Sequence, residues 1–325
     1  MLRRALLSLA PTALVAAPLA VSSPASAQEW PARPVRMIVP FAAGGVTDMV
    51  GRVVGGDLSR RLGQPVVVEN RVGAGGNIGA DACAKATDGH TICMGTISSH
   101  AINPAIYPRI PFDNLRDFAP VALLGSQPNA LVVSNALPVR SVPDLVAYMR
   151  ARPGGLNYGS SGVGTSIHLA GELLTQLTGT EAVHVPYRSS GQLATDILAG
   201  QLPMSFDNFS SVFPHAREGR MRMLAVGSAG RWPAAPDVPT VAETLPGFES
   251  LSWHGLFAPA TMPRANVDRL IRETVAALAS PEVTGRFNDV GIAPGTVSGD
   301  AFREFVASET RRWGEVARRA NIRAE

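Results

Sequence analysis

The feature that most restricts the fold is a repeated alternation of short apolar segments with longer segments of helical periodicity. Residues 35–40 form a short apolar run, which is typical of a buried strand. Residues 47–62 then place valine and leucine three or four positions apart, and Gly63 follows as a helix stop. Because strands and helices alternate along the chain, the sequence predicts an α/β fold with mainly parallel sheets.

The same alternation continues to the end of the chain. Further strands are predicted at 66–69, 91–94, 121–124, 130–133, 156–158, 183–186, 203–206 and 223–226. Further helices are predicted at 76–85, 142–150, 165–177, 192–198, 264–279 and 299–319, with an irregular proline-rich segment at 231–247. Each half opens with a strand, a loop rich in Gly, Ser or Thr, and a helix. Since ligands lie beyond the carboxyl ends of such strands, these two loops predict a cleft between two lobes.

The start of the chain predicts export. Two arginines precede an apolar run at 5–21, and Ala25-Ser26-Ala27 follows with the small residues of a signal-peptidase site. This pattern predicts a signal peptide at 1–27 that is cleaved near Ala27. A membrane anchor is the alternative, but two prolines interrupt the run and it falls short of the roughly 20 residues that span a bilayer. We expect an exported mature protein that is not embedded in the membrane.

Composition narrows the choice of partners. The 325 residues are 46% hydrophobic and 17% charged, as in ordinary globular proteins. The length after the signal suits two domains. The formal charge is +3, and removal of the two arginines of the signal leaves +1. The sequence contains no run of basic residues interleaved with aromatic ones, so nucleic acid is not the expected partner.

The two cysteines allow two interpretations. Cys83 falls in a predicted helix and Cys93 in the strand that follows. Export to an oxidising compartment favours a disulfide between them. Two buried thiols that serve as small apolar residues are the alternative, and the sequence does not decide between the two.

The first candidate binding loop joins strand 35–40 to helix 47–62. Its paired glycines allow a ligand to approach the backbone, and the helix behind them offers unpaired N–H groups to a carboxylate. We predict ligand contacts from the following residues: Phe41, Ala43, Gly44, Gly45, Thr47 and Asp48. Thr47 or Asp48 could instead only cap the helix.

The second candidate loop precedes the helix at 165–177. It offers hydroxyl groups and flexible amides, which bind carboxylates directly or through water. The predicted ligand-binding residues are Ser160, Ser161, Gly162, Gly164, Thr165 and Ser166, together with Tyr187 and Asp207 at the ends of two later strands. A capped flexible loop is the alternative. Arg188 could pair with a ligand carboxylate or form a surface ion pair.

Two enzyme classes fit less well. The turn at 73–79 has Ile78 where a dinucleotide-binding turn requires its last glycine, so a closely packed turn is the better interpretation. A serine hydrolase would use Ser160 or Ser161, but Val163 stands where the nucleophile elbow requires glycine. The six histidines are scattered without metal-ligand spacing. We therefore expect no catalytic residues, no metal and no cofactor.

Seven segments in order carry a family resemblance: PVRMIVPFAAGGVTDMVGR, VVVENRVGAGGNIGAD, DGHTICMGT, NPAIYPRIPFDNLRDFAPVALLG, LNYGSSGVGTSIHLAGELL, VHVPYRSSGQLATDILAGQLPMSFDN and DVPTVAETLPGFE with a later WHGLFAPA. Together they resemble the Bug receptors, the extracytoplasmic solute-binding proteins of tripartite tricarboxylate transporters. The resemblance covers essentially the whole mature chain. The segment Ser189-Ser190-Gly191-Gln192 departs from the Gly-rich, Pro-containing stretch of the family, and Pro203 and Ser205 interrupt another family run.

The resemblance implies a periplasmic-binding-protein-like fold with two α/β lobes joined by crossing strands. It implies one lobe of about residues 28–126 and 255–325 and a second of 127–254, which close on a ligand held by the two loops. The implied ligand is a small carboxylate such as a dicarboxylate or tricarboxylate, an acidic amino acid or an aromatic acid. The implied partners are the membrane subunits of the transporter, and the implied location is the periplasm. We expect a monomer, since nothing in the sequence requires a partner chain for the fold. A secreted hydrolase and a ligand sensor are the alternatives.

Overall fold

The computed structural model describes residues 30–324, so the predicted signal peptide at 1–27 lies outside the described residues. Ten strands form one hydrogen-bonded sheet in the order β2-β1-β3-β9-β4-β7-β5-β6, with β8 and β10 paired to β4. The strands are β1 (Val35–Val39), β2 (Val66–Asn70), β3 (Thr91–Thr96), β4 (Phe118–Val133), β5 (Asn157–Ser160), β6 (Val183–Pro186), β7 (Met204–Asn208), β8 (Arg222–Val226), β9 (Leu251–Pro259) and β10 (Ala293–Pro294).

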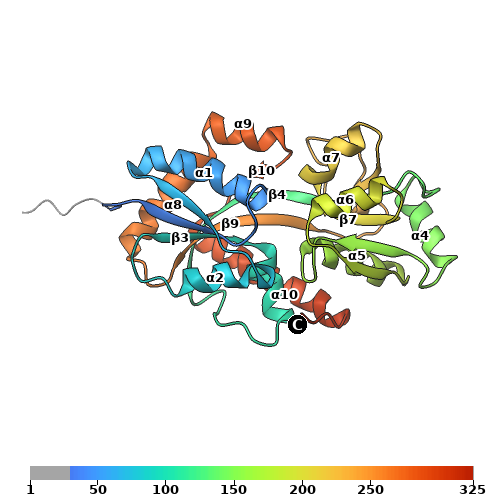
Figure 1. Ribbon diagram of the computed structural model, residues 1–325, viewed down its shortest axis with the longest axis horizontal. Helices are drawn as coiled ribbons and strands as arrows, with labels where there is room; N and C mark the ends of the chain where they lie inside the picture. The colour runs from blue at the N-terminus through green and yellow to red at the C-terminus, as the bar shows by residue number, and fades with distance from the viewer. Residues whose placement is uncertain (1–29, 325) are drawn as a thin grey trace, which may run out of the picture.

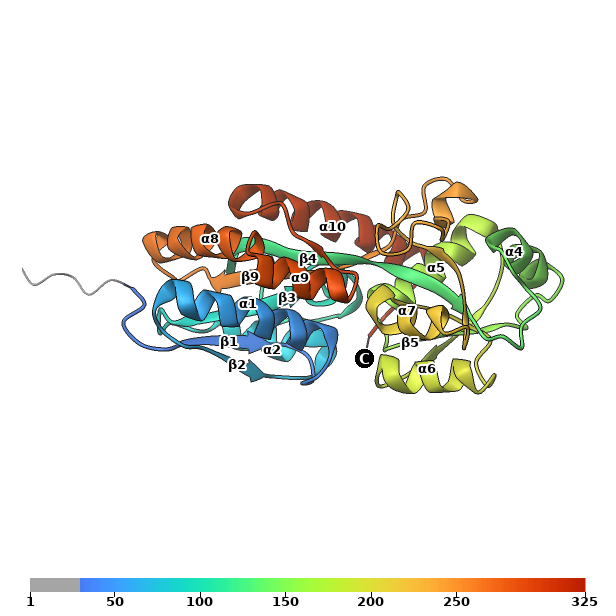
Figure 2. The same cartoon turned by 90° about the horizontal axis from the view of Figure 1, so that it is seen from above.

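Two groups of parallel strands flank an antiparallel centre. In the first group β1 pairs in parallel with β2 and β3, and in the second β5 pairs in parallel with β6 and β7. Between them β4 and β9 are antiparallel, and both run from one half of the molecule into the other (Figures 1 and 2). The structure therefore confirms an α/β fold with two halves joined by crossing strands.

Helices cover both faces of each half. They are α1 (Val46–Leu62), α2 (Asn77–Ala84), α3 (Asn103–Ile106), α4 (Val142–Arg150), α5 (Ser166–Thr178), α6 (Ser190–Leu198), α7 (Phe209–Arg217), α8 (Arg264–Leu278), α9 (Pro281–Asp289) and α10 (Gly299–Arg319). Shorter helical turns are η1 (Ala74–Gly76), η2 (Ser98–Ile102) and η3 (Val241–Glu243). Between residues 30 and 324, no helix combines the length and the apolar character needed to cross a membrane.

Alternation along the strands sends side chains into two cores in each half. In β1, Met37 packs with α1, α8 and α9, whereas Ile38 packs with α2 and α10 on the opposite face. In β4, Leu131 faces α4 and α5, whereas Val132 faces α6 and α7. Each helix is thus fixed by an apolar face, and the loops between strands and helices are left at the edge of the sheet.

The crossing strands differ most from the sequence-based expectation. The separate strands predicted at 121–124 and 130–133 are wrong, because both belong to the 16-residue β4. The residues between them are polar or helix-breaking, yet Gln127 and Asn129 are fully buried. Gln127 accepts a hydrogen bond from the Ser210 N–H (2.9 Å), and Asn129 accepts one from the Ser250 hydroxyl (2.8 Å). Long-range polar partners therefore keep the strand continuous.

The cysteine question has a definite answer. Cys83 on α2 and Cys93 on β3 form a disulfide, with Cα atoms 6.1 Å apart. Both residues are fully buried within the core formed by α2 and α10. The bond ties a helix of the first half directly to the sheet beneath it.

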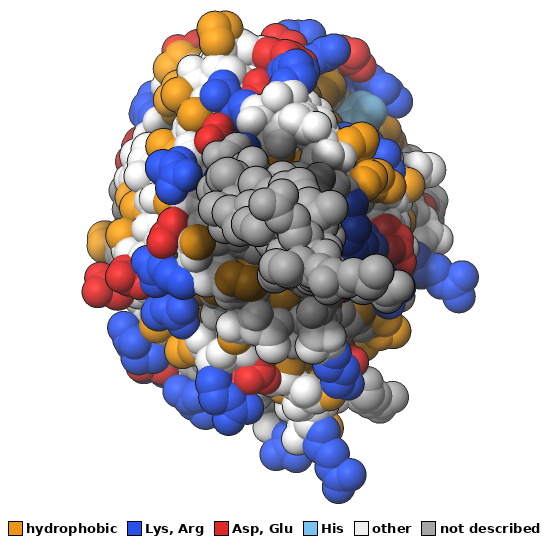
Figure 3. All heavy atoms as spheres, turned by 90° about the vertical axis from the view of Figure 1, so that its left-hand side faces the viewer, with side chains coloured by type: hydrophobic (Ala, Val, Ile, Leu, Met, Phe, Trp, Pro, Cys, Tyr) orange, Lys and Arg blue, Asp and Glu red, His pale blue; other side chains and the backbone are white. Residues whose placement is uncertain are grey.

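One end of the molecule, at the left of Figure 1, is drawn in Figure 3. Basic and acidic side chains are interspersed over this face, with apolar side chains between them. A surface of mixed charge attracts a polyanion weakly.

Candidate functional site

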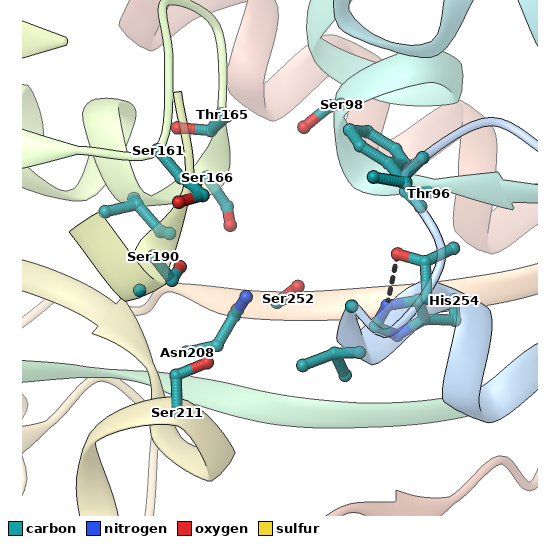
Figure 4. A pocket seen from close by; sticks show the side chains of 18 of the residues that line it. Thr96, Ser98, Ser161, Thr165, Ser166, Ser190, Asn208, Ser211, Ser252 and His254 are labelled. Atoms are coloured by element: carbon teal, nitrogen blue, oxygen red, sulfur yellow. Dashed lines mark hydrogen bonds between the residues drawn. The ribbon is translucent and has the colours of Figure 1, made fainter. Parts of the chain in front are cut away.

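A cavity of about 480 Å³ lies between the two halves, at the carboxyl ends of their parallel strands (Figure 4). This volume lies within the roughly 300–1,000 Å³ of typical small-molecule sites. Its wall consists mostly of loops that join a strand to a helix. The lining residues are Phe41, Ala42, Ala43, Gly44, Gly45, Val46, Thr47, Thr96, Ile97, Ser98, Ser161, Thr165, Ser166, Ile167, Arg188, Ser189, Ser190, Gly191, Asn208, Ser211, Ser252 and His254.

The first predicted loop lines the cavity, with Asp48 behind it. Gly44 has a φ of 80°, and its N–H donates to Asp48 Oδ2 (2.9 Å). The same oxygen accepts from Arg52 Nε (2.9 Å), and Oδ1 accepts from Asn70 Nδ2 (2.8 Å). Burial alone would raise the pKa of Asp48, but these hydrogen bonds outweigh it and lower the pKa below its usual value. Asp48 is 3% exposed and does not line the cavity, so it holds the loop from the rear.

The second predicted loop lies across the cavity on the other half. Thr165 caps α5 by accepting a hydrogen bond from the His168 N–H (3.3 Å), and its hydroxyl donates to the Gly162 carbonyl (2.8 Å). Gly164 has a φ of 76°, and a Cβ there would lie 2.1 Å from Ile106 Cδ1. Of the predicted residues in this loop, Ser161, Thr165 and Ser166 line the cavity, whereas Ser160, Gly162 and Gly164 do not.

Two stacked histidines support the second loop from behind. The His168 and His184 rings are 3.7 Å apart between centroids. His184 Nε2 lies 2.7 Å from the Ser160 hydroxyl, and His168 Nδ1 accepts from the Gly164 N–H (3.2 Å). Burial lowers the pKa of His168 to about 3 and that of His184 to about 4, so both rings are neutral near pH 7.

Tyr187 and Asp207, the two predicted strand-end residues, do not line the cavity. The Tyr187 hydroxyl donates to Asp196 (2.8 Å). Asp207 is fully buried and accepts from the Ser190 hydroxyl and the Asn208 N–H, both at 2.7 Å. Burial raises the pKa of Asp207 to about 6, although both hydrogen bonds act to lower it. Each of the two side chains therefore supports the wall from outside the cavity.

Sequence reasoning missed three parts of the wall, one of which is the starts of α6 and α7 with Ser189, Ser190, Gly191 and Ser211. Thr96 ends β3 and Ile97 and Ser98 follow it, so the rule that ligands lie beyond strand ends could have indicated them. Ser252 and His254 come from β9, a strand that the sequence did not predict. His254 Nε2 lies 3.1 Å from Thr47 Oγ1 (Figure 4), and burial lowers its pKa to about 4. A neutral histidine on a crossing strand thus positions the start of α1.

The cavity wall favours an anion. The amino-terminal ends of α1, α5, α6 and α7 all contribute lining residues, and such ends carry free N–H groups and partial positive charge. Among the lining residues there is no Asp or Glu, and Arg188 is the one arginine. A carboxylate can therefore enter without meeting a like charge.

The alternative chemistries find little support in this wall. Ser160 is fully buried, and its histidine partner lies behind the loop and not in the cavity. In the part of the chain that the structure describes, no group of three His, Cys, Asp or Glu residues could hold a metal. The glycine turn at 73–79 is closely packed, since a Cβ on Gly79 would lie 2.9 Å from Pro40 Cα.

Relatives share the sequence over most of its length. BugT of Bordetella pertussis (strain Tohama I) is 38% identical over 301 residues, which cover 92% of each chain. Two solved structures superpose closely. R. palustris Rpa4515 with adipate has a TM-score of 0.84 at 39% identity and covers 91% of this chain and 99% of that one. MatC of Rhodopseudomonas palustris with bound malate has a TM-score of 0.80 at 32% identity and covers 88% and 99%.

The family comparison agrees with these relatives. The model of the TctC family, described as the tripartite tricarboxylate transporter family receptor, matches residues 50–322. That range contains both halves of the fold and three of the four helix ends that line the cavity. The chain therefore belongs to the TctC receptor family of the tripartite tricarboxylate transporters, which includes the Bug proteins.

Proposed function

We propose that this chain is a periplasmic receptor that captures a small carboxylate in the cavity and presents it to the membrane subunits of a tripartite transporter. The observation that carries the proposal is a cavity walled by helix starts and hydroxyl groups, without an acidic side chain. Relatives with the same fold hold adipate and malate, which are both carboxylates.

The first carboxylate group would lie between the starts of α1 and α5. The N–H groups of a helix's first turn have no partners within the helix and suit an anion. Hydroxyl groups of Thr47, Ser161 and Ser166 add neutral donors on both sides. The proposed contact set is completed by Phe41, Ala43, Gly44, Gly45 and Thr165. The residues that support the two loops from behind are Asp48, Ser160, Gly162, Gly164, Tyr187 and Asp207.

Capture would involve movement about the crossing strands. β4 and β9 connect the two halves, and β9 provides Ser252 and His254 to the cavity wall. We place one lobe at 28–126 with 255–325 and the other at 127–254, which would close on the ligand as two rigid bodies. The signal peptide at 1–27 would deliver the receptor to the periplasm, where it acts as a monomer.

A substitution that fills the cavity tests the proposal. Mature protein stripped of ligand is titrated with dicarboxylates, tricarboxylates, acidic amino acids and aromatic acids in a thermal-shift assay. A bound acid at about 100 times its Kd stabilises the fold by about 2.7 kcal/mol, a rise of several degrees in Tm. Gly45→Trp places an indole in the cavity wall and should abolish that rise without lowering the Tm of the free protein.

Gly56→Trp is the matched control. Gly56 lies within α1, the helix that Gly45 precedes, is exposed and has open space around its Cβ position. This variant should bind the acid as the wild type does. Unchanged affinity in Gly45→Trp would show that the acid binds elsewhere, and the absence of binding by the wild type to any acid would contradict carboxylate capture itself.

A further inference from the structure

Asp207 is an acidic side chain hidden directly behind the cavity wall. It lies on β7 and its side chain turns toward α6, whereas Phe206 before it packs with α4 and α5 on the other face of the sheet. Its Oδ1 accepts hydrogen bonds from the Ser190 hydroxyl and the Asn208 N–H, and both of these residues line the cavity. The carboxyl group of Asp207 is therefore separated from a ligand at the starts of α6 and α7 by only one residue.

The charge of Asp207 has no counter-ion among the described residues. The side chain is fully buried, and its Oδ2 has no hydrogen-bond partner between residues 30 and 324. Other titratable side chains lie on the elements that pack against β7 or directly before α6, and in this part of the chain none of them forms a hydrogen bond or an ion pair with Asp207. They are Tyr158 on β5, His168 and Glu172 on α5, Asp196 on α6, His215 and Arg217 on α7, and Tyr187 and Arg188 before α6. The first three contact one another on the opposite face of the sheet.

This environment places Asp207 close to the balance between its two forms. Burial opposes the ionised form and is the larger effect, while the two hydrogen bonds to Oδ1 favour it, and the pKa of Asp207 is raised to about 6. A small change in the surroundings can therefore shift this carboxyl group from the ionised form to the protonated one near neutral pH.

The region proposed for the ligand carboxylate adjoins this group. Asn129 Nδ2 donates both to Ser166 Oγ at the start of α5 (3.3 Å) and to Asn208 Oδ1 before α7 (3.5 Å), so the two helix starts share a partner. Figure 4 shows Ser166, Ser190 and Asn208 on the same side of the cavity. An anion held there and an ionised Asp207 repel each other, because solvent screens charges poorly in a buried site.

We infer that Asp207 takes up a proton from solvent when the receptor binds its carboxylate ligand, so that capture becomes stronger as the pH falls. This inference rests on the proposed function, because it requires an anion in the cavity near Asn208. Protonation of Asp207 removes the repulsion. It also weakens the hold of Asp207 on the Ser190 hydroxyl, whose single proton can then be donated to the ligand. The affinity should rise as the pH falls from about 8 and level off below about 6, where Asp207 is already protonated in the free protein.

Asp207→Asn tests the role of this carboxyl group. Asparagine keeps an acceptor oxygen for Ser190 and Asn208 and has no charge at any pH. Calorimetric titrations from about pH 8 to 5.5 use the acid that gives the largest thermal shift, with adipate and malate among those screened. The affinity of the wild type should rise relative to that of the variant on the order of tenfold, since one unit of pKa corresponds to that factor. At pH 8 the variant should bind more tightly than the wild type. The protonation of the acid itself affects both proteins alike and cancels in the comparison.

Proton uptake is measured on the wild type alone, so this test does not depend on the folding of the variant. Titrations at about pH 6.5 in buffers with different heats of ionisation report the number of protons bound together with the acid. The wild type should take up protons. The acid cannot be their source of uptake, because hydrogen-bond donors around a carboxylate lower its pKa.

Asp144→Asn is the matched control, because it removes one negative charge from the same half of the molecule. Asp144 is exposed on α4, at the right of Figure 1, and does not line the cavity. This variant should keep the pH profile of the wild type. If the wild type binds an acid without proton uptake, or if its pH profile runs parallel to that of Asp207→Asn, the inference is overturned while carboxylate capture stands. If the wild type binds no acid at all, carboxylate capture is contradicted and the inference fails with it.

Discussion

The two loops that face each other across the cavity are held in place by opposite kinds of chemistry. Behind the first loop, Asp48 gathers hydrogen bonds from Gly44, Arg52 and Asn70. Behind the second, His168 and His184 stack as neutral rings and contact Gly164 and Ser160. Both arrangements position a helix start at the cavity, and neither places an acidic side chain on the cavity wall. The comparison shows that a helix end can be fixed equally by an ionised network or by an uncharged one.

The largest expected effect comes from the glycines that each loop requires. Gly44→Ala and Gly164→Ala both force alanine into a left-handed conformation, at a cost of about 1–2 kcal/mol. Gly44 has open space at its Cβ position, whereas the Gly164 Cβ would meet Ile106, which is buried. Overpacking adds about 1–3 kcal/mol, so Gly164→Ala should reduce the free energy of unfolding by about 2–5 kcal/mol and Gly44→Ala by less. If urea denaturation gave the same loss in the free energy of unfolding for both variants, the close contact between Ile106 of α3 and the second loop would be contradicted.

A smaller loss is expected when the charged network is removed. Asp48→Ala leaves the Gly44 N–H and the Asn70 amide without their acceptor, which should cost about 1.5–3 kcal/mol. Denaturant unfolding measures the loss, and titration of the acid that the wild type binds measures its effect on affinity. Asp268→Ala on α8 is the control, because its partner Arg264 and Asp268 itself are both exposed. A stable Asp48→Ala protein with unchanged affinity would show that the first loop needs no support from this carboxylate.

The finest distinction between the loops is their response to acid. A histidine whose pKa is lowered on folding binds fewer protons in the folded state, so its stabilisation is complete above pH 6.5 and is lost as the pH falls toward the folded value. For His184 that window runs from 6.5 to about 4. The pKa of Asp48 is lowered from 3.8, so the support that this carboxylate gives to the first loop is lost only below that pH.

His184→Phe isolates this response, because phenylalanine can keep the stacking and cannot be protonated. The free energy of unfolding, measured from pH 7 to 4.5, should fall less steeply in the variant than in the wild type, by up to about 1.4 kcal/mol per pH unit. His100, His168 and His254 also have lowered pKa values and contribute to the slope in both proteins. Parallel pH profiles would mean that His184 is not held in its neutral form.

Much of the fold follows from local sequence pattern, although helices α3, α7 and α9 were not predicted, and the errors in the two crossing strands have a common cause. Helix α10 spans 299–319 as predicted, because its apolar residues repeat at helical spacing along one face. β9 was missed and β4 was divided, because both are buried on two sides and contain polar residues and glycines whose partners lie far along the chain. Local periodicity does not reveal partners such as Ser250 for Asn129.

The site was predictable to a similar degree. Both loops were located from the rule that ligands lie at helix starts beyond strand ends, and eight of their predicted residues line the cavity. Asp48 was ambiguous because a carboxylate at a helix start can serve a ligand or the protein, and its hydrogen bonds with Gly44, Arg52 and Asn70 are formed only in three dimensions. His254 was not among the predicted contacts, because the strand that carries it was not predicted.

The convergence of four helix starts has a consequence for how such receptors diversify. Much of the attraction for an anion comes from main-chain N–H groups, which every residue except proline provides. Most single substitutions in the wall can therefore alter the shape of the cavity without removing its affinity for acids. A lineage of these receptors can exchange one nutrient for another in small steps and remain a receptor for acids at every step.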